Sequence, residues 1–164
     1  MLRNGLLIAL VFLLTACGFQ LRGTENAIHH SFTEVTVVNS TADKRFQQIL
    51  EEALKNAGVL VAEDSDTKLE LLSSTPRRRT ASFSSRAKSA EFELLKEVSF
   101  RFSHQEDVVI ETTQLQARRS YLYRETAAVG KAEEEILLRK EMDEDLAQRI
   151  LLYLQRSVAE SSKP

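Results

Sequence analysis

A basic segment in the middle of the chain, SSTPRRRTASFSSRAKSA, has residue types that could bind a negatively charged ligand. It contains no acidic residue, and its five cations are Arg77, Arg78, Arg79, Arg86 and Lys88. Arginine donates hydrogen bonds in a planar fork that fits phosphate, and the serine and threonine hydroxyls add further donors. Since the whole chain carries a net charge of −2, five uncompensated cations in one loop predict a local anion site. The alternative is a solvated, positively charged connection between two strands.

A second basic group lies at the end of the last expected strand and in the loop after it. Its members are Arg118, Arg119, Arg124 and Lys131. If residues 91–104 and 108–123 pair as a hairpin around a turn at 105–107, then residues near 119–124 come to lie beside the 86–92 region. The two basic groups would then meet at one end of the domain, where we expect phosphorylated lipid or sugar to bind. The net acidic charge argues against a nucleic-acid-binding protein.

No set of residues with the spacing of a catalytic or metal site is present in the sequence. The histidines are His29, His30 and His104, which lack the spacing and partners of metal ligands. There is no glycine-rich phosphate loop, GxSxG elbow or HExxH motif. The sequence therefore predicts a protein that is not an enzyme and has no cofactor or metal. The enzymatic alternative is a small hydrolase that uses scattered acids.

The single cysteine, Cys17, follows an export signal rather than lying in a folded domain. Arg3 precedes an apolar run at 6–14, and small residues lead to the cysteine. The run is shorter than the about 20 residues that span a bilayer. The sequence Leu14-Thr15-Ala16-Cys17 resembles the lipobox of bacterial lipoproteins, which implies cleavage before Cys17 and its acylation. We expect residues 1–16 to be a cleaved signal peptide and residues 17–32 a lipidated tether. The alternative is that Cys17 is an ordinary residue of the signal.

The rest of the chain predicts a single α+β domain over residues 33–158, followed by a tail at 159–164. Apolar and β-branched alternation predicts strands at 33–39, 68–73, 91–104 and 108–123, and the last of these allows a bulge. Three- and four-residue spacing predicts helices at 42–57 and 132–158. The order is β-α-β-β-β-α, with two helices packed on one face of a small, about four-stranded sheet.

Local signals refine these elements. Thr41 is a candidate cap for the first helix, and Gly58 lies where that helix should end. Residues 133–135 are acidic and are expected in the first turn of the last helix, where its dipole favours them. Within the apolar face of the long strand, only Lys96 breaks the pattern.

Taken together, several short motifs resemble the LptE (RlpB) family of lipopolysaccharide-assembly lipoproteins. They are ACGFQLRG after the lipobox, SAEFEL at the start of the long strand and ARRSY before the final helix. The resemblance implies a plug inside the outer-membrane β-barrel LptD that assists its assembly and the insertion of lipopolysaccharide. It also implies lipopolysaccharide binding by basic residues whose places are held here by Arg86 or Lys88, and by Lys131.

From the residues and the resemblance, we expect an outer-membrane lipoprotein that faces the periplasm and the barrel lumen. Gly18 follows Cys17 in place of an aspartate, which in lipoproteins generally permits transport to the outer membrane. The residues expected to bind lipopolysaccharide are Arg77, Arg78, Arg79, Arg86, Lys88, Arg118, Arg119 and Lys131. The alternative function is that of a free, periplasm-facing lipoprotein that binds peptidoglycan or another anionic polymer.

Overall fold

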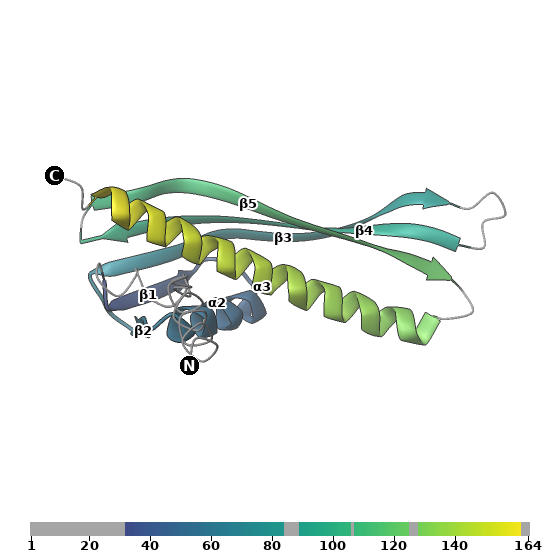
Figure 1. The fold of residues 1–164 in the computed structure, drawn as a ribbon, viewed down its shortest axis with the longest axis horizontal. Helices are drawn as coiled ribbons and strands as arrows, with labels where there is room; N and C mark the ends of the chain where they lie inside the picture. The colour runs from purple at the N-terminus through teal and green to yellow at the C-terminus, as the bar shows by residue number, and fades with distance from the viewer. Residues whose placement is uncertain (1–31, 84–88, 106, 125–127, 162–164) are drawn as a thin grey trace, which may run out of the picture.

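Two helices cover one face of a five-stranded sheet in the computed structural model (Figure 1). The structure describes residues 32–83, 89–105, 107–124 and 128–161. The elements are β1 (Glu34–Asn39), α2 (Lys44–Asn56), β2 (Leu60–Val61), β3 (Thr67–Phe83), β4 (Ser89–His104), β5 (Asp107–Arg124) and α3 (Ala128–Ser161). The predicted α+β class is confirmed, but the sheet has one strand more than the expected four. The additional strand, β2, has only two residues and is too short for alternation to reveal it.

The strands lie in the order β2-β1-β3-β4-β5. β1 is parallel to both β2 and β3, whereas β3, β4 and β5 form antiparallel pairs. The parallel arrangement follows from α2, which carries the chain back across the sheet before β2 and β3 begin. β1 is only six residues long and pairs with β3 at residues 68–71, so the rest of β3 extends beyond it.

α2 forms where the sequence predicts a helix, but a different residue caps it. The Asp43 carboxylate accepts a hydrogen bond from Phe46 N at 3.0 Å and makes Asp43 the N-cap. The prediction of Thr41 is wrong, because Asn39 holds Thr41 ahead of the helix and the Thr41 hydroxyl accepts from Asp43 N instead. After the helix, Gly58 adopts a φ of 83°, a left-handed conformation that glycine reaches without strain.

β3 is the largest departure from the predicted elements. The sequence predicts a strand at 68–73 followed by a loop, yet β3 runs to Phe83 and contains Arg77, Arg78 and Arg79. Pairing with β4 continues from Thr67 to Phe83, with irregularities at Leu71/Ser73 and Thr80/Ser82. Residues 76–82 in the second half of β3 are exposed, and this part of the strand lacks apolar alternation. Its extended conformation therefore depends on hydrogen bonding to β4 rather than on burial of its own side chains.

The β4–β5 hairpin agrees closely with the sequence. His104 pairs with Asp107 across the turn, where Gln105 has a φ of 56°. The register shifts twice between Phe100 and Ser103, so β5 has two irregularities where the sequence allows a bulge. From Phe100 back to Ser89 the register is regular, and Ser89 pairs with Arg124.

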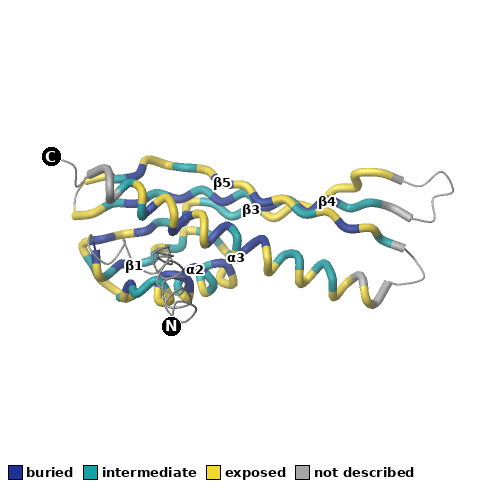
Figure 2. The backbone as a smooth tube through the Cα atoms, viewed as in Figure 1, coloured by how far each residue is buried: buried dark blue, intermediate teal, exposed yellow. Residues whose placement is uncertain are grey.

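α3 lies along the sheet and completes the core (Figure 2). Residues four apart on its inner face are buried: Met142, Leu146, Ile150 and Leu154. They join side chains of α2 and of the strands in one apolar cluster. The helix starts four residues earlier than predicted, so residues 133–135 do not lie in its first turn, which has no acidic residue. Among the described residues, no helix is long and apolar enough to cross a membrane.

Candidate functional site

The hairpin register brings basic residues of two distant segments to one end of the sheet. β4 lies between β3 and β5, with Arg79 opposite Glu93 on one side and Arg118 opposite Leu95 on the other. We call this region, residues 77–80 of β3, 91–95 of β4, 117–121 of β5 and the start of α3, the basic end. The observed register confirms the strand pairing that the sequence predicts. It also divides the arginines between the two faces of the sheet, since neighbouring residues of a strand point to opposite sides.

Arg78 and Arg119 point to the face covered by α3, which we call the helix face. Arg78 Nη1 donates to Glu135 Oε2 at 3.1 Å. The Arg78 guanidinium also lies 5.0 Å from the centre of the Phe92 ring, within cation–π range. Arg119 Nη2 lies 3.8 Å from Asp145 Oδ2. Both arginines therefore contribute to the attachment of α3 to the sheet.

Glu135 is the carboxylate around which the contacts of the helix face gather. It accepts hydrogen bonds from Tyr121 Oη at 2.5 Å and from Arg139 Nη2 at 2.6 Å, in addition to Arg78. Burial raises the pKa of Glu135, but these hydrogen bonds stabilise its charged form more strongly and lower the pKa to about 2. The contacts join β3, β5 and α3 through one ionised group.

Arg77, Arg79 and Arg118 point to the opposite side of the sheet, which we call the open face. Arg77 Nη2 lies 3.9 Å from Glu97 Oε2. Glu93 accepts a hydrogen bond from Arg79 Nε and forms an ion pair with Arg118 Nε at 3.1 Å. The hydrogen bond from Arg79 is the main reason that the pKa of Glu93 lies below its usual value. The open face thus carries alternating arginine and glutamate side chains over three strands.

The arginines of β3 are not uncompensated, as the sequence suggested. Arg77, Arg78 and Arg79 each have a carboxylate partner, and these partners come from β4 and α3. The acidic residues are absent from the basic segment but are supplied by neighbouring elements. The sequence did not reveal these pairs because their carboxylates lie on other elements, at least 14 residues away along the chain. The available signal was the even spacing of Glu93 and Glu97, which puts both on one face of the strand that the basic segments flank.

The remaining candidate residues are described only in part or not at all. Cys17, Arg86 and Lys88 lie outside the described residues. The backbone of Lys131 lies in the first turn of α3. The roles of these residues in lipidation and ligand binding stay predictions.

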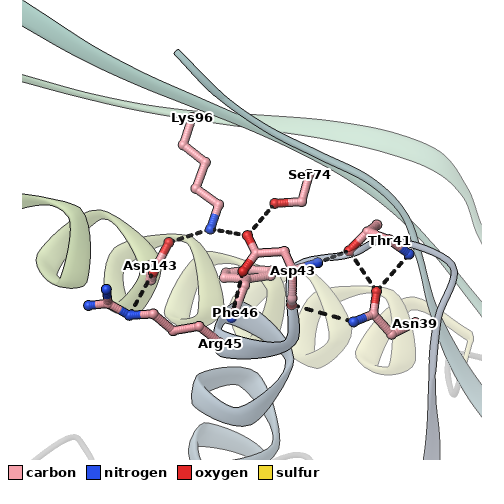
Figure 3. A network of polar contacts seen from close by, with 8 residues as sticks. All are labelled: Asn39, Thr41, Asp43, Arg45, Phe46, Ser74, Lys96 and Asp143. Atoms are coloured by element: carbon pink, nitrogen blue, oxygen red, sulfur yellow. Dashed lines mark hydrogen bonds and ion pairs between the residues drawn. The ribbon is translucent and has the colours of Figure 1, made fainter. Parts of the chain in front are cut away.

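A second polar cluster surrounds Lys96 and has the character of a structural contact (Figure 3). Lys96 Nζ donates to Asp43 Oδ2 at 2.7 Å and to Asp143 Oδ1 at 2.5 Å, and both Lys96 and Asp143 are buried. Ser74 also donates to Asp43, and Arg45 lies 3.7 Å from Asp143. Burial raises the pKa of Asp43, but the hydrogen bonds it accepts, that of Lys96 first, lower it overall. The cluster joins the start of α2 to β4 and α3, and it borders a cavity of about 150 Å³.

Within the described part of the chain, no group of three or more histidine, cysteine or acidic residues could hold a metal ion. The chemistry that the arrangement supports is the binding of an anion by guanidinium groups. Arginine side chains of the basic end are available on the open face, where Arg79 is 67% and Arg118 57% exposed.

Comparison with known proteins identifies one family and several solved structures that are similar to this chain. A family model described as LptE: Lipopolysaccharide-assembly matches residues 32–154. A minor lipoprotein from Acinetobacter baumannii is 26% identical, with a TM-score of 0.64 over 76% of this chain and 92% of that one. Rare lipoprotein B from Shewanella oneidensis shares the fold at 24% identity, with a TM-score of 0.70 over 79% and 99% of the two chains. Uncharacterized lipoprotein B from Nitrosomonas europaea does so at 24% identity, with a TM-score of 0.69 over 88% and 94%. No curated protein matches the sequence.

Proposed function

The chain belongs to the LptE lipopolysaccharide-assembly family, and from this membership we propose that it is an outer-membrane lipoprotein of the lipopolysaccharide transport machinery. In this role it is anchored by acylated Cys17, plugs the lumen of an LptD-type β-barrel and assists the assembly of that barrel. It also binds lipopolysaccharide for insertion into the outer leaflet.

The observation that carries the proposal is the family match over residues 32–154, which includes almost all of the described fold. The arginines of the basic end support it, because lipid A and core sugars carry phosphate groups that guanidinium binds well. The domain is also long and thin at the basic end, where β3, β4 and β5 extend past α2 with α3 alongside (Figure 1). Such a shape suits insertion into a tubular lumen.

Co-purification from solubilised membranes tests the partner. The full-length, tagged lipoprotein should bring with it a large β-barrel protein in a stable complex. Recovery of the lipoprotein without a large β-barrel partner would contradict the proposal. That result would favour a free, periplasm-facing lipoprotein that binds an anionic polymer such as peptidoglycan.

A charge-reversal pair tests the ligand. We expect Arg86→Asp combined with Lys131→Asp to weaken the recovery of lipopolysaccharide in a pull-down, while circular dichroism shows an intact fold. The matched control is Lys68→Asp with Arg156→Asp, which makes the same change in charge at two exposed positions outside the basic end. Equal recovery by both double variants would refute the assignment of these residues to the ligand.

A further inference from the structure

Three neighbouring strands of the open face place two arginines around one carboxylate. Arg79 comes from β3, Glu93 from β4 and Arg118 from β5. Arg118 Nε lies 3.1 Å from Glu93 Oε1, and Arg79 Nε donates to Oε2. Each carboxylate oxygen therefore holds one guanidinium, and both guanidiniums are held through the same atom, Nε.

In this arrangement, the Nη groups of both arginines are not used in the contacts with Glu93. Within the part of the chain that the structure describes, the Arg79 and Arg118 side chains contact no acid other than Glu93. Their side chains are 67% and 57% exposed, whereas the Glu93 side chain is 10% exposed. The two guanidiniums thus cover the carboxylate, and a ligand that approaches from solvent meets their free N–H groups first.

The net charge of the trio favours an anionic ligand. Two guanidiniums and one carboxylate leave a net positive charge at the trio, and Glu93 stays ionised because its pKa lies below the usual value. A phosphate monoester presents several oxygens in tetrahedral directions and can accept from two planar forks at once. A carboxylate ligand has only two oxygens, and Glu93 already provides a carboxylate between the two guanidiniums.

We infer that Arg79 and Arg118 form a clamp for one phosphate monoester on the open face of the sheet, and that Glu93 positions the two guanidiniums from below. The clamp consists of other residues than the predicted group at Arg86, Lys88 and Lys131. The inference rests on the proposed function for the identity of the ligand, a phosphorylated sugar of lipopolysaccharide. The chemistry that it recognises is shared with inorganic phosphate and with other phosphate monoesters.

The test uses full-length lipoprotein in detergent and a double variant that keeps the charge, Arg79→Lys with Arg118→Lys. Lysine preserves the positive charge but lacks the fork, so lost binding reports geometry rather than charge. We expect lipopolysaccharide affinity to fall by about tenfold, comparable to one lost charge-assisted contact. The matched control is Arg101→Lys, since Arg101 is also an arginine of the open face, paired with Glu70 outside the basic end. It should bind as the wild type does.

Two further probes identify the source of the phosphate. Lipopolysaccharide stripped of its phosphates should bind the wild type more weakly and should no longer distinguish it from the double variant. Inorganic phosphate should compete with intact lipopolysaccharide for the wild type. Equal binding of intact and stripped lipopolysaccharide, or an equal loss in Arg101→Lys, would overturn the clamp.

Glu93→Gln tests the positioning role separately. In nuclear magnetic resonance spectra, the Nε–Hε signals of Arg79 and Arg118 should shift in this variant while that of Arg101 stays in place. Affinity should not rise although the variant is more positive, because the two forks lose their common charged anchor. A rise in affinity would show that Glu93 only repels the ligand and would overturn its positioning role.

The outcomes separate this inference from the proposed function. A stable barrel complex together with full lipopolysaccharide binding by the lysine variant would overturn the clamp alone. Absence of a barrel partner, with phosphate binding that still depends on Arg79 and Arg118, would contradict the proposed function and support the clamp.

Discussion

The two ends of the molecule are held together by different forces. At one end, which we call the core end, α2 packs with the part of α3 from Met142 to Leu154, and β1 contributes Val35 to the same mostly apolar cluster of buried residues. At the basic end, carboxylates on β4 and α3 pair with arginines of neighbouring strands. α3 belongs to both ends: Leu146 and Ile150 are fully buried, whereas Ile136 and Leu137 are 60% and 56% exposed.

The difference between the two ends indicates where substitutions can be made without loss of the fold. Apolar burial supplies most of the stabilisation of a domain, whereas exposed ion pairs are each worth at most about 1 kcal/mol and weaken with salt. The basic end therefore has the lower local stability, and it is also the end that carries the candidate ligand-binding groups. This agrees with the general finding that binding regions come from the less stable parts of a fold.

The largest expected effect is at Lys96, a charge within the core end. Lys96→Ala leaves two carboxylates, Asp43 and Asp143, without their shared cation in a largely buried place. Uncompensated buried charge of this kind costs about 3–5 kcal/mol of unfolding free energy. Urea denaturation of the variant beside the wild type measures it.

A neutral replacement of the whole cluster is the control. Lys96→Met with Asp43→Asn and Asp143→Asn removes all three charges, and asparagine can still cap α2. We expect this variant to recover most of the loss, because neutral groups of similar size often replace buried ion pairs at little cost. A triple variant as unstable as Lys96→Ala would show that the cluster stabilises through its charges.

A pair of leucine truncations on α3 compares the two ends directly. Leu146→Ala creates a cavity in the apolar core and should cost about 3 kcal/mol. Leu138 is only partly buried towards the basic end, so Leu138→Ala should cost about 1 kcal/mol. Chemical denaturation of both variants measures the difference. Equal losses would contradict the division of α3 into a buried and a weakly packed part.

The pH dependence of Glu135 reports the stability of the basic end. Its folded-state pKa of about 2 lies below the usual 4.5. A lowered pKa stabilises the fold above the unfolded-state value, and this contribution is lost as pH falls from about 4.5 towards 2. Glu135→Gln should lose about 1–2 kcal/mol at pH 7, less than the full shift implies, because solvent screens the group. Denaturation at a series of pH values should show wild type and variant converging below pH 4.5; a constant difference would contradict the assignment.

The fold could be predicted where a segment carries its own signal. The alternation of Phe92, Leu94, Val98, Phe100 and Phe102 defines β4. Together with the turn at 105–107, it also predicts the hairpin and so the approach of the two basic groups, although the irregularities in β5 shift the register by two residues. The spacing of α3 similarly identifies the face that enters the core.

What could not be predicted depends on partners distant in sequence. The second half of β3 is a strand because β4 pairs with it, and its own residues show no alternation of apolar and polar types that would predict a strand. Lys96 stands out in the sequence as a break in an apolar face, but its partners lie 53 and 47 residues away. The pairing of Arg79 and Arg118 with Glu93 likewise requires three strands in their correct order.

The smallest expected effect concerns a hydroxyl in β1. Thr36 Oγ1 is buried and has no hydrogen-bond partner in the described part of the chain. Thr36→Val keeps the shape and removes this unsatisfied group, so it should stabilise the fold by about 0.5–1 kcal/mol. The matched control, Thr80→Val, changes an exposed threonine of the basic end and should alter stability by less than about 0.5 kcal/mol. Because the substitution is the same, a gain only at Thr36 would isolate the effect of burial, and a gain at both positions would attribute it to the β-propensity of valine.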